Sequence, residues 1–361
     1  MKKALFVPYF HPCGINDYTR FLHTSLQDET LLCTDSQKIP KDLDLLHVQY
    51  DAGLFRQGRR NILPQVMALP VRRKVITVHE VYEMNPYIAR RPNRNGLISS
   101  LKQVKWDFLH RLERKEEGFA ALNYFADSII VHTQAAADVL KRKRCDSGKI
   151  QVWPHPAIIV PKGDRQKGRQ RFGLPEEGVV ILVFGFITPA NDYATFFSAI
   201  EPLQGKVTVL LAGGPREGRY QSIQQEMGQA IVEKGLSASV VRTGYVEESL
   251  LPDLFAAADL FVSIARVKTA SGPISRALGS GLPVLAADMD YTRELAGQSE
   301  AVIRYESGNA EALKQGIVSL LDKEYRLRLC AAADEYAKTH SFAAFAANHL
   351  QLYRRLFESH S

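Results

Sequence analysis

The stretch Val179-Val180-Ile181-Leu182-Val183-Phe184-Gly185-Phe186 is apolar at almost every position and contains a glycine near its end. It lacks the alternation of apolar and polar residues that marks a strand with one face in water. An unbroken apolar run of this length is typical of a parallel strand that helices cover on both faces. The run therefore predicts a central strand of a parallel α/β sheet.

Similar runs recur on both sides of this stretch, and longer segments with helical periodicity separate them. They comprise residues 4–9, 43–50, 74–80, 128–133 and 149–156 in the first half, and 207–214, 239–246, 260–266, 282–288 and 301–306 in the second. The repeated order of strand and helix predicts an α/β fold with two doubly wound, Rossmann-like domains. Such sheets bind ligands at the carboxyl ends of their strands, so we expect the domains to face a central cleft.

Apolar periodicity is lost over residues 161–175, which are rich in Lys, Arg, Gly and Pro. We interpret this segment as a linker between an N-terminal domain, 1–160, and a C-terminal domain, 176–340. The last residues, 341–361, have an amphipathic pattern that begins at a possible N-cap serine. They predict a terminal helix.

The composition excludes several classes of protein. The 361 residues are 45% hydrophobic and 24% charged, which is enough apolar material for two cores and argues against disorder. No apolar run approaches the roughly 20 residues that span a bilayer, and Pro8 interrupts the N-terminal run, so we expect neither a membrane span nor a signal peptide. Four scattered cysteines without a CxxC pair argue against a zinc or redox site and indicate the cytoplasm.

The net charge of +7 is confined to the first half of the chain. Residues 1–160 contain 24 Lys and Arg against 16 Asp and Glu, whereas residues 161–361 contain 22 against 23. Between 97 and 112, cations alternate with apolar residues that include Trp106 and Phe108. This pattern suits a helix at an anionic membrane surface, and equally a solvated helix whose apolar stripe joins the core. Nucleic acid ranks below these, because no recognised binding motif is present.

Several residues with chemical potential stand where a strand ends. Gly14 follows the first strand, and the helix through Asp17 and Tyr18 would direct its N-terminal amides at an anion such as a diphosphate. Glycine at such a turn can also serve geometry alone. His79, His132 and His155 close later strands, and we favour His79 because Glu80 and a polar loop follow it. A structural hydrogen-bonding role is the alternative for each histidine.

The ordered series of these pieces resembles the GT-B glycosyltransferases, specifically their retaining family-four branch. In the first half the pieces are 14–18, 44–50, 77–80, 131–133 and 153–156, and in the second they are 184–187, 211–214, 243–246, 254–260, 271–272, 277–278, 281–284 and 341–353. The resemblance implies a metal-independent, retaining hexosyltransferase in glycan synthesis without a cofactor. A nucleotide-diphosphate sugar would bind the second domain, a saccharide or lipid-linked acceptor would bind the first, and the terminal helix would cross back to the first domain.

The resemblance, together with the chemistry of the side chains, assigns site residues in this chain. His79 and Lys268 are the catalytic candidates, and Asp17, Tyr18 and Glu80 are the acceptor-binding candidates. The donor-binding candidates are Gly14, Gly185, Thr188, Gly214, Arg216, Gly244, Tyr245, Arg266, Thr269, Ser271, Gly272, Arg276 and Glu294. No metal ligands are assigned, because Asp288-Met289-Asp290 follows a late strand and is interpreted as a turn.

The chain also departs from the family pattern. No cation follows Gly185 in 186–192, where the family has an arginine and a lysine, and Lys268 and Arg276 replace two glutamates. A guanidinium only donates hydrogen bonds, so it cannot replace a carboxylate that accepts them from ribose. One interpretation is that Arg266, Lys268 and Arg276 neutralise the diphosphate from the opposite side. The alternatives are a catalytically degenerate scaffold subunit, whose cations are merely solvated, and a glycosyltransferase that acts on modified nucleic acid bases.

Overall fold

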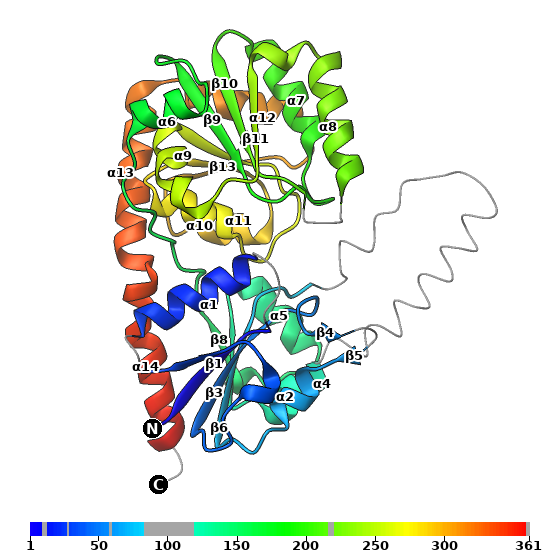
Figure 1. Cartoon of the computed structure of the whole chain (residues 1–361), viewed down its shortest axis with the longest axis vertical. Helices are drawn as coiled ribbons and strands as arrows, with labels where there is room; N and C mark the ends of the chain where they lie inside the picture. Colours follow the sequence, from blue (N-terminus) through cyan, green and yellow to red (C-terminus); the bar gives the residue numbers. More distant parts are fainter. Residues whose placement is uncertain (9–12, 27–28, 58–59, 83–118, 216–219, 359–361) are drawn as a thin grey trace, which may run out of the picture. The chain divides into compact units, whose positions relative to one another are not determined.

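The computed structural model describes residues 1–8, 13–26, 29–57, 60–82, 119–215 and 220–358, shown as the coloured ribbon in Figure 1. The expected arginine at 216 and the basic segment 97–112 lie outside these ranges. The chain divides into two compact units. Unit 1 comprises Met1–Pro154 and Phe345–Ser361, and unit 2 comprises His155–Ala344.

Unit 1 is built on a six-stranded sheet with the order β2-β1-β3-β6-β7-β8, and its neighbouring strands are parallel. The strands are β1 (Lys3–Phe6), β2 (Leu31–Cys33), β3 (Leu45–Tyr50), β6 (Arg73–Val78), β7 (Ser128–Val131) and β8 (Ile150–Val152). A small hairpin pairs β4 (Arg56–Gln57) with β5 (Arg60–Asn61). The helices are α1 (Gly14–Ser25), α2 (Leu63–Met67), α4 (Phe119–Phe125) and α5 (Gln134–Arg142), and from Phe345 onward α14 (Phe342–Glu358) also belongs to this unit.

Unit 2 holds a second six-stranded parallel sheet, with the order β11-β10-β9-β12-β13-β14. Its strands are β9 (Val179–Phe184), β10 (Val207–Ala212), β11 (Val240–Gly244), β12 (Leu260–Ser263), β13 (Val284–Ala287) and β14 (Val302–Tyr305). Its helices are α6 (Arg165–Arg171), α7 (Tyr193–Ile200), α8 (Gln221–Glu233), α9 (Leu251–Ala257), α10 (Gly272–Gly279), α11 (Asp290–Ala296), α12 (Ala310–Ser319) and α13 (Lys323–His340).

Strand β9 explains why an unbroken apolar run predicts this fold. Val180 and Leu182 belong to one apolar cluster, formed with helices that include α9, α10 and α13. Ile181 and Val183 belong to the cluster on the other face, formed with α7, α8 and α12, and Figure 1 shows these helices on opposite sides of the sheet. Because both faces are buried, every position of the strand must be apolar. The prediction of two doubly wound α/β domains is confirmed.

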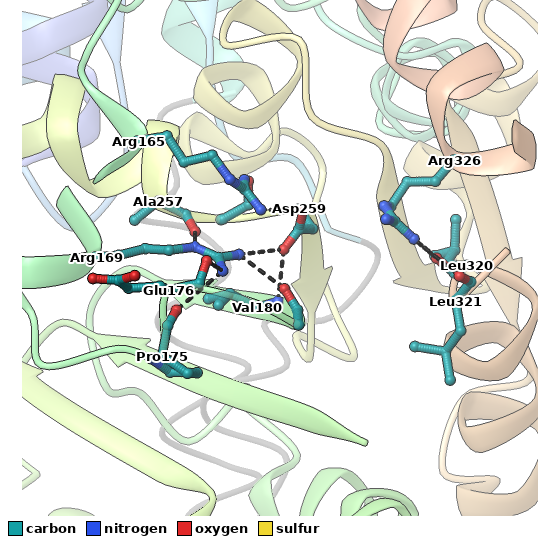
Figure 2. A network of polar contacts seen from close by, with 12 residues as sticks. Arg165, Arg169, Pro175, Glu176, Val180, Ala257, Asp259, Leu320, Leu321 and Arg326 are labelled. Carbon is teal, nitrogen blue, oxygen red and sulfur yellow. Dashed lines mark hydrogen bonds and ion pairs between the residues drawn. The ribbon is translucent and has the colours of Figure 1, made fainter. Parts of the chain in front are cut away.

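Residues 161–175, which we interpreted as a linker, instead contain helix α6 and lie within unit 2. The buried guanidinium of Arg169 donates to Asp259 Oδ2 at 2.8 Å, as Figure 2 shows. It also donates to the backbone carbonyls of Ala257, Pro175, Glu176 and Gly178. The segment has no apolar periodicity because a buried cation, rather than an apolar stripe, docks it against the sheet.

Candidate functional site

In each sheet the loops after the strands meet at the carboxyl edge, and the strand order reverses at one place. In unit 1 the reversal lies between β1 and β3, and in unit 2 it lies between β9 and β12. Loops diverge at such a switch point, which is where open α/β sheets bind ligands.

Helix α1 of unit 1 begins with an open backbone. Cys13 caps it, with its Sγ accepting from the Asn16 amide at 3.5 Å, and a side chain added at Gly14 would meet no atom of the described residues within 4 Å. Backbone amides at a helix N-terminus can bind an anion. Asp17 and Tyr18 follow in the first two turns, where Asp17 pairs with Arg20 at 3.2 Å and Tyr18 is buried.

The structure brings three of the singled-out side chains of unit 1 together. The Tyr18 ring centroid lies 4.6 Å from that of His79 and 5.4 Å from that of His132, and the two histidines are 5.3 Å apart. All three are buried, and burial raises the pKa of Tyr18 far above its usual range, so its hydroxyl stays protonated. Glu80, the next residue after His79, is half-buried. His155 belongs to unit 2, where its Nδ1 lies 2.8 Å from Ser275 Oγ.

Two buried polar residues of this site were not found from the sequence. Gln49 Oε1 lies 3.0 Å from His79 Nε2, and His47 lies behind Gln49 on the same strand, β3. Both side chains are fully buried. Their signal was present in the sequence, because they are polar residues two positions apart within an otherwise buried run and therefore share one face of the strand.

Glycines shape the carboxyl edge of unit 2. Gly185 follows β9 with a φ of 128°, and Gly213 follows β10 with a φ of 136°. A Cβ at Gly213 would stand 1.9 Å from the carbonyl oxygen of Gly185, so this approach requires glycine. Gly244 ends β11 with a φ of 69°, and the position of a Cβ on Gly214 lies 3.6 Å from the Tyr245 amide. The three loops are therefore adjacent, and the Tyr245 ring beside them is 55% exposed.

Helix α10 directs its N-terminus at the same place. Ser271 caps the helix by accepting from the Ile274 amide at 3.3 Å, and nothing lies within 4 Å of a Cβ on Gly272. The position of a Cβ on Gly185 is 3.1 Å from Pro273 Cγ, which brings the β9 loop against this helix end. An open helix N-terminus beside glycine loops can receive a diphosphate through backbone amides.

The predicted cations of unit 2 already have carboxylate partners. Arg266 Nη1 lies 3.2 Å from Asp192 Oδ2. The Arg276 side chain is 8% exposed, and its two terminal nitrogens lie 3.3 Å from Oε1 of Glu248, whose side chain is 53% exposed. Lys268 and Thr269 lie half-buried in the loop after β12. Arg266 and Arg276 thus stand in balanced pairs.

The remaining donor-site candidates are more scattered. Thr188 donates to Asn191 Oδ1 at 2.6 Å in the loop after β9, and Glu294 is half-buried in α11. Asp288 pairs with Arg293 at 2.9 Å and with Arg304, and these charges lower its pKa. Across the part of the chain that the structure describes, no cluster of three or more His, Cys, Asp or Glu side chains is arranged to hold a metal ion.

No helix among the described ranges combines the length and the apolar character needed to cross a membrane.

Sequence comparison places the chain near glycosyltransferases. Residues 178–323 match the family model "Glycosyl transferases group 1". The mannosylfructose-phosphate synthase of Agrobacterium fabrum is 28% identical over 76% of this chain and 60% of that protein. The D-inositol 3-phosphate glycosyltransferase of Corynebacterium glutamicum is 26% identical over 63% of this chain and 57% of that protein. The matches to these curated relatives thus span about 60% of their length.

Structural comparison extends over nearly the whole chain. HepE of Anabaena, in complex with UDP and glucose, has a TM-score of 0.76 at 16% identity, with 97% of this chain and 99% of that chain covered. Sucrose-phosphate synthase from Thermosynechococcus elongatus gives the same score and identity over 99% of this chain and 100% of that chain. These likenesses confirm the GT-B fold. Residues 178–323 are therefore a glycosyl transferases group 1 domain, carried by a chain with the GT-B fold.

Proposed function

We propose that the chain is a glycosyltransferase that moves a hexose from a nucleotide-diphosphate sugar to a saccharide or lipid-linked acceptor, with retention of configuration and without a metal ion. The observation that carries this proposal is the edge of the group 1 domain, where glycine loops at Gly185, Gly213 and Gly244 adjoin the open N-terminus of α10. HepE, whose fold is similar, binds UDP, which supports a nucleotide donor.

The donor diphosphate would be held chiefly by backbone amides. Gly272 and its neighbours at the start of α10 offer N–H groups whose helix partners are missing, and Gly185 lets the anion come close to the β9 loop. Fixed dipoles of this kind stabilise the charge that develops on the leaving diphosphate. The exposed Tyr245 would contact the base, and Thr188, Ser271 and Glu294 would supply polar groups for the sugar and the ribose.

The cations would contribute unequally. Arg266 and Arg276 are already offset by Asp192 and Glu248, so they act on an anion only together with those carboxylates. Lys268, which replaces a glutamate of the family in the loop after β12, would neutralise phosphate charge from that loop. The interpretation that Arg266, Lys268 and Arg276 face the diphosphate from the opposite side is thereby refined. Arg266 and Arg276, as balanced pairs, can orient hydrogen bonds without adding net charge to the site.

The acceptor would be bound by unit 1. His79, with Tyr18 beside it, would line the transferred sugar, while Asp17 and Glu80 would accept hydrogen bonds from acceptor hydroxyls. The enzyme would be cytoplasmic, and the excess of cations in 1–160 would attract it to an anionic membrane surface. A lipid-linked acceptor would be presented at such a surface.

A scaffold subunit that lacks turnover is the second candidate. Two observations favour it. Arg266 and Arg276 are already paired with Asp192 and Glu248, and residues 186–192 contain no cation that could bind a diphosphate. Binding of a nucleotide-sugar followed by transfer distinguishes the enzyme from the scaffold.

The first test is thermal unfolding with nucleoside diphosphates of each base and with their sugar conjugates. A ligand at about 100 times its Kd stabilises the fold by about 2.7 kcal/mol, and each kcal/mol raises Tm by roughly 2–4 °C. We expect one base to give a selective shift and its sugar conjugate to be consumed when acceptors are supplied.

The matched variants are Lys268→Ala and Lys206→Ala. Lys206 is exposed and precedes β10, at the amino edge of the same sheet. Lys268→Ala should lose most of the shift, whereas Lys206→Ala should retain it. The absence of a shift with every nucleotide would overturn the proposed donor, and a shift without any transfer would favour the scaffold.

A further inference from the structure

A chain of buried polar groups runs through unit 1 behind His79. His47 and Gln49 are two positions apart on β3 and share one face of the strand, and Thr77 lies opposite Gln49 on the neighbouring strand β6. Tyr353 reaches this group from α14, the helix at the end of the sequence. His47, Gln49, Thr77 and Tyr353 are all 0% exposed. Four polar side chains buried this completely must satisfy one another.

The hydrogen bonds link these groups in series. His47 Nδ1 lies 2.7 Å from the Tyr353 hydroxyl, and His47 Nε2 lies 2.8 Å from Thr77 Oγ1. Gln49 Nε2 lies 3.2 Å from His47 Nε2. The other end of the same amide, Gln49 Oε1, lies 3.0 Å from His79 Nε2. A continuous path therefore joins the C-terminal helix to the histidine of the candidate site.

The glutamine gives this path a direction. An amide nitrogen only donates and an amide oxygen only accepts. As oriented in the structure, Gln49 donates to His47 Nε2 and accepts from His79 Nε2. Burial, with a smaller effect from His349, holds the pKa of His47 well below its usual range, so this ring is neutral and has one donor nitrogen. Its proton is then on Nδ1 and is donated to Tyr353.

We infer that Tyr353, His47 and Gln49 are positioning residues that fix the tautomer of His79, keeping its proton on Nε2 and leaving Nδ1 as the acceptor nitrogen. If the Gln49 amide turned over, its oxygen would face His47 Nε2 and its nitrogen would face His79 Nε2. Each ring would then have to carry its proton on its other nitrogen, so the tautomers of His47 and His79 change together. The catalytic meaning of this tautomer rests on the proposed function, in which His79 lines the transferred sugar. The relay itself does not depend on any ligand.

The test is the 15N spectrum of the histidine rings of the full chain, because a protonated and an unprotonated ring nitrogen resonate far apart. Comparison with His79→Gln identifies the His79 signals. In the parent, His79 should carry its proton on Nε2. In Tyr353→Phe, His47 loses the acceptor for Nδ1–H, and a buried N–H without a partner is unfavourable. Its proton should move to Nε2, the amide should turn, and His79 should become mainly Nδ1-protonated.

Tyr336→Phe is the matched control. Tyr336 is also buried, and its hydroxyl has no hydrogen-bond partner among the residues that the structure describes. It lies on α13 in unit 2, so its loss should leave the His79 signals unchanged. An unchanged His79 tautomer in folded Tyr353→Phe would overturn the inference, as would a parent His79 protonated on Nδ1.

Gln49→Glu gives a second measurement that does not depend on the folding of Tyr353→Phe. A carboxylate accepts at both ends, so His47 should move its proton to Nε2 while His79 keeps its own on Nε2. Movement of the His79 proton to Nδ1 in this variant would also overturn the inference. If these spectra agree with expectation while the parent transfers no sugar, the relay stands and the proposed function fails.

Discussion

At the scale of single residues, Asp259 bonds two arginines at nearly equal distance but with very different burial. Its carboxylate lies 2.8 Å from Arg169 and 2.7 Å from Arg165, and it also accepts from the Val180 amide at 2.8 Å. The Arg169 side chain is 2% exposed, whereas that of Arg165 is 47% exposed. Figure 2 shows both guanidinium groups on the same carboxylate. The pair separates the effect of burial from that of distance.

We expect Arg169→Met to destabilise unit 2 by about 3–5 kcal/mol, because it removes the buried cation beside a mostly buried carboxylate and leaves several carbonyls without this donor. Arg165→Met should cost at most about 1 kcal/mol, since water screens an exposed pair. Urea unfolding of both variants measures the difference. Equal losses would show that burial does not set the strength of these pairs.

Residue-scale contacts were also the least predictable from the sequence. Most partners of Arg169 are backbone carbonyls, which carry no residue identity that a sequence could reveal. Arg276 was expected to meet a diphosphate, yet it pairs with Glu248, 28 positions away. Such pairing depends on how loops meet at the sheet edge. The position of His79 directly after β6 could be predicted, because it follows from the strand pattern alone.

At the scale of elements, the glycines before and after β10 are needed for two separable reasons. Gly213 has a φ of 136°, and a Cβ there would also overlap the Gly185 carbonyl oxygen. Gly205 precedes β10 with a φ of 75°, but a Cβ there would meet nothing within 4 Å. The first position combines backbone strain with a clash, and the second has the strain alone.

Gly205→Ala should therefore cost about 1–2 kcal/mol of unfolding free energy from backbone strain. Gly213→Ala should cost about 1–3 kcal/mol more, because the loop after β9 must also move. The same movement should weaken any nucleotide shift in Gly213→Ala. Chemical denaturation and thermal shift measure both effects. A Gly213→Ala protein as stable as Gly205→Ala would mean that the two loops do not need their close approach.

Elements were predicted well where burial on two faces dictates composition. The runs at 43–50 and 179–186 contain β3 and β9. A strand in a sheet that helices cover on both faces is buried at every position, so its residues are mostly apolar. The exceptions are informative, since the buried His47 and Gln49 interrupt that rule and form the path to His79. Helix α6 was missed because it is short, charged and anchored by a single buried cation.

At the scale of the whole molecule, buried neutral histidines are shared unequally between the two units. Burial lowers the pKa of His155 and of His349 to about 4 and that of His47 well below its usual range. His47 and His349 belong to unit 1, whereas His155 belongs to unit 2. In the unfolded chain each has a pKa near 6.5, so below that pH the unfolded state binds more protons.

Stability contributed by these histidines is therefore complete above about pH 6.5 and is lost as pH falls, by roughly 1.4 kcal/mol per pH unit for each histidine. Unit 1, which holds two of them, should lose stability more steeply than unit 2 between pH 6.5 and pH 5, although burial also lowers the pKa of His340 in unit 2. Carboxylates such as Glu29 and Asp288, whose pKa values are lowered by cations, titrate below this window and do not obscure it.

The two tryptophans make this difference measurable, because Trp106 and Trp153 both lie within Met1–Pro154. Tryptophan fluorescence thus follows the unfolding of unit 1, while circular dichroism follows both units. In urea at pH 7, 6 and 5, the fluorescence midpoint should fall faster than the later circular dichroism transition. His349→Phe should roughly halve the pH slope of unit 1, since it removes one titrating ring and keeps an aromatic side chain beside Trp153. A fluorescence midpoint independent of pH would contradict neutral burial of His47 and His349, and with it the single proton that His47 contributes to the path toward His79.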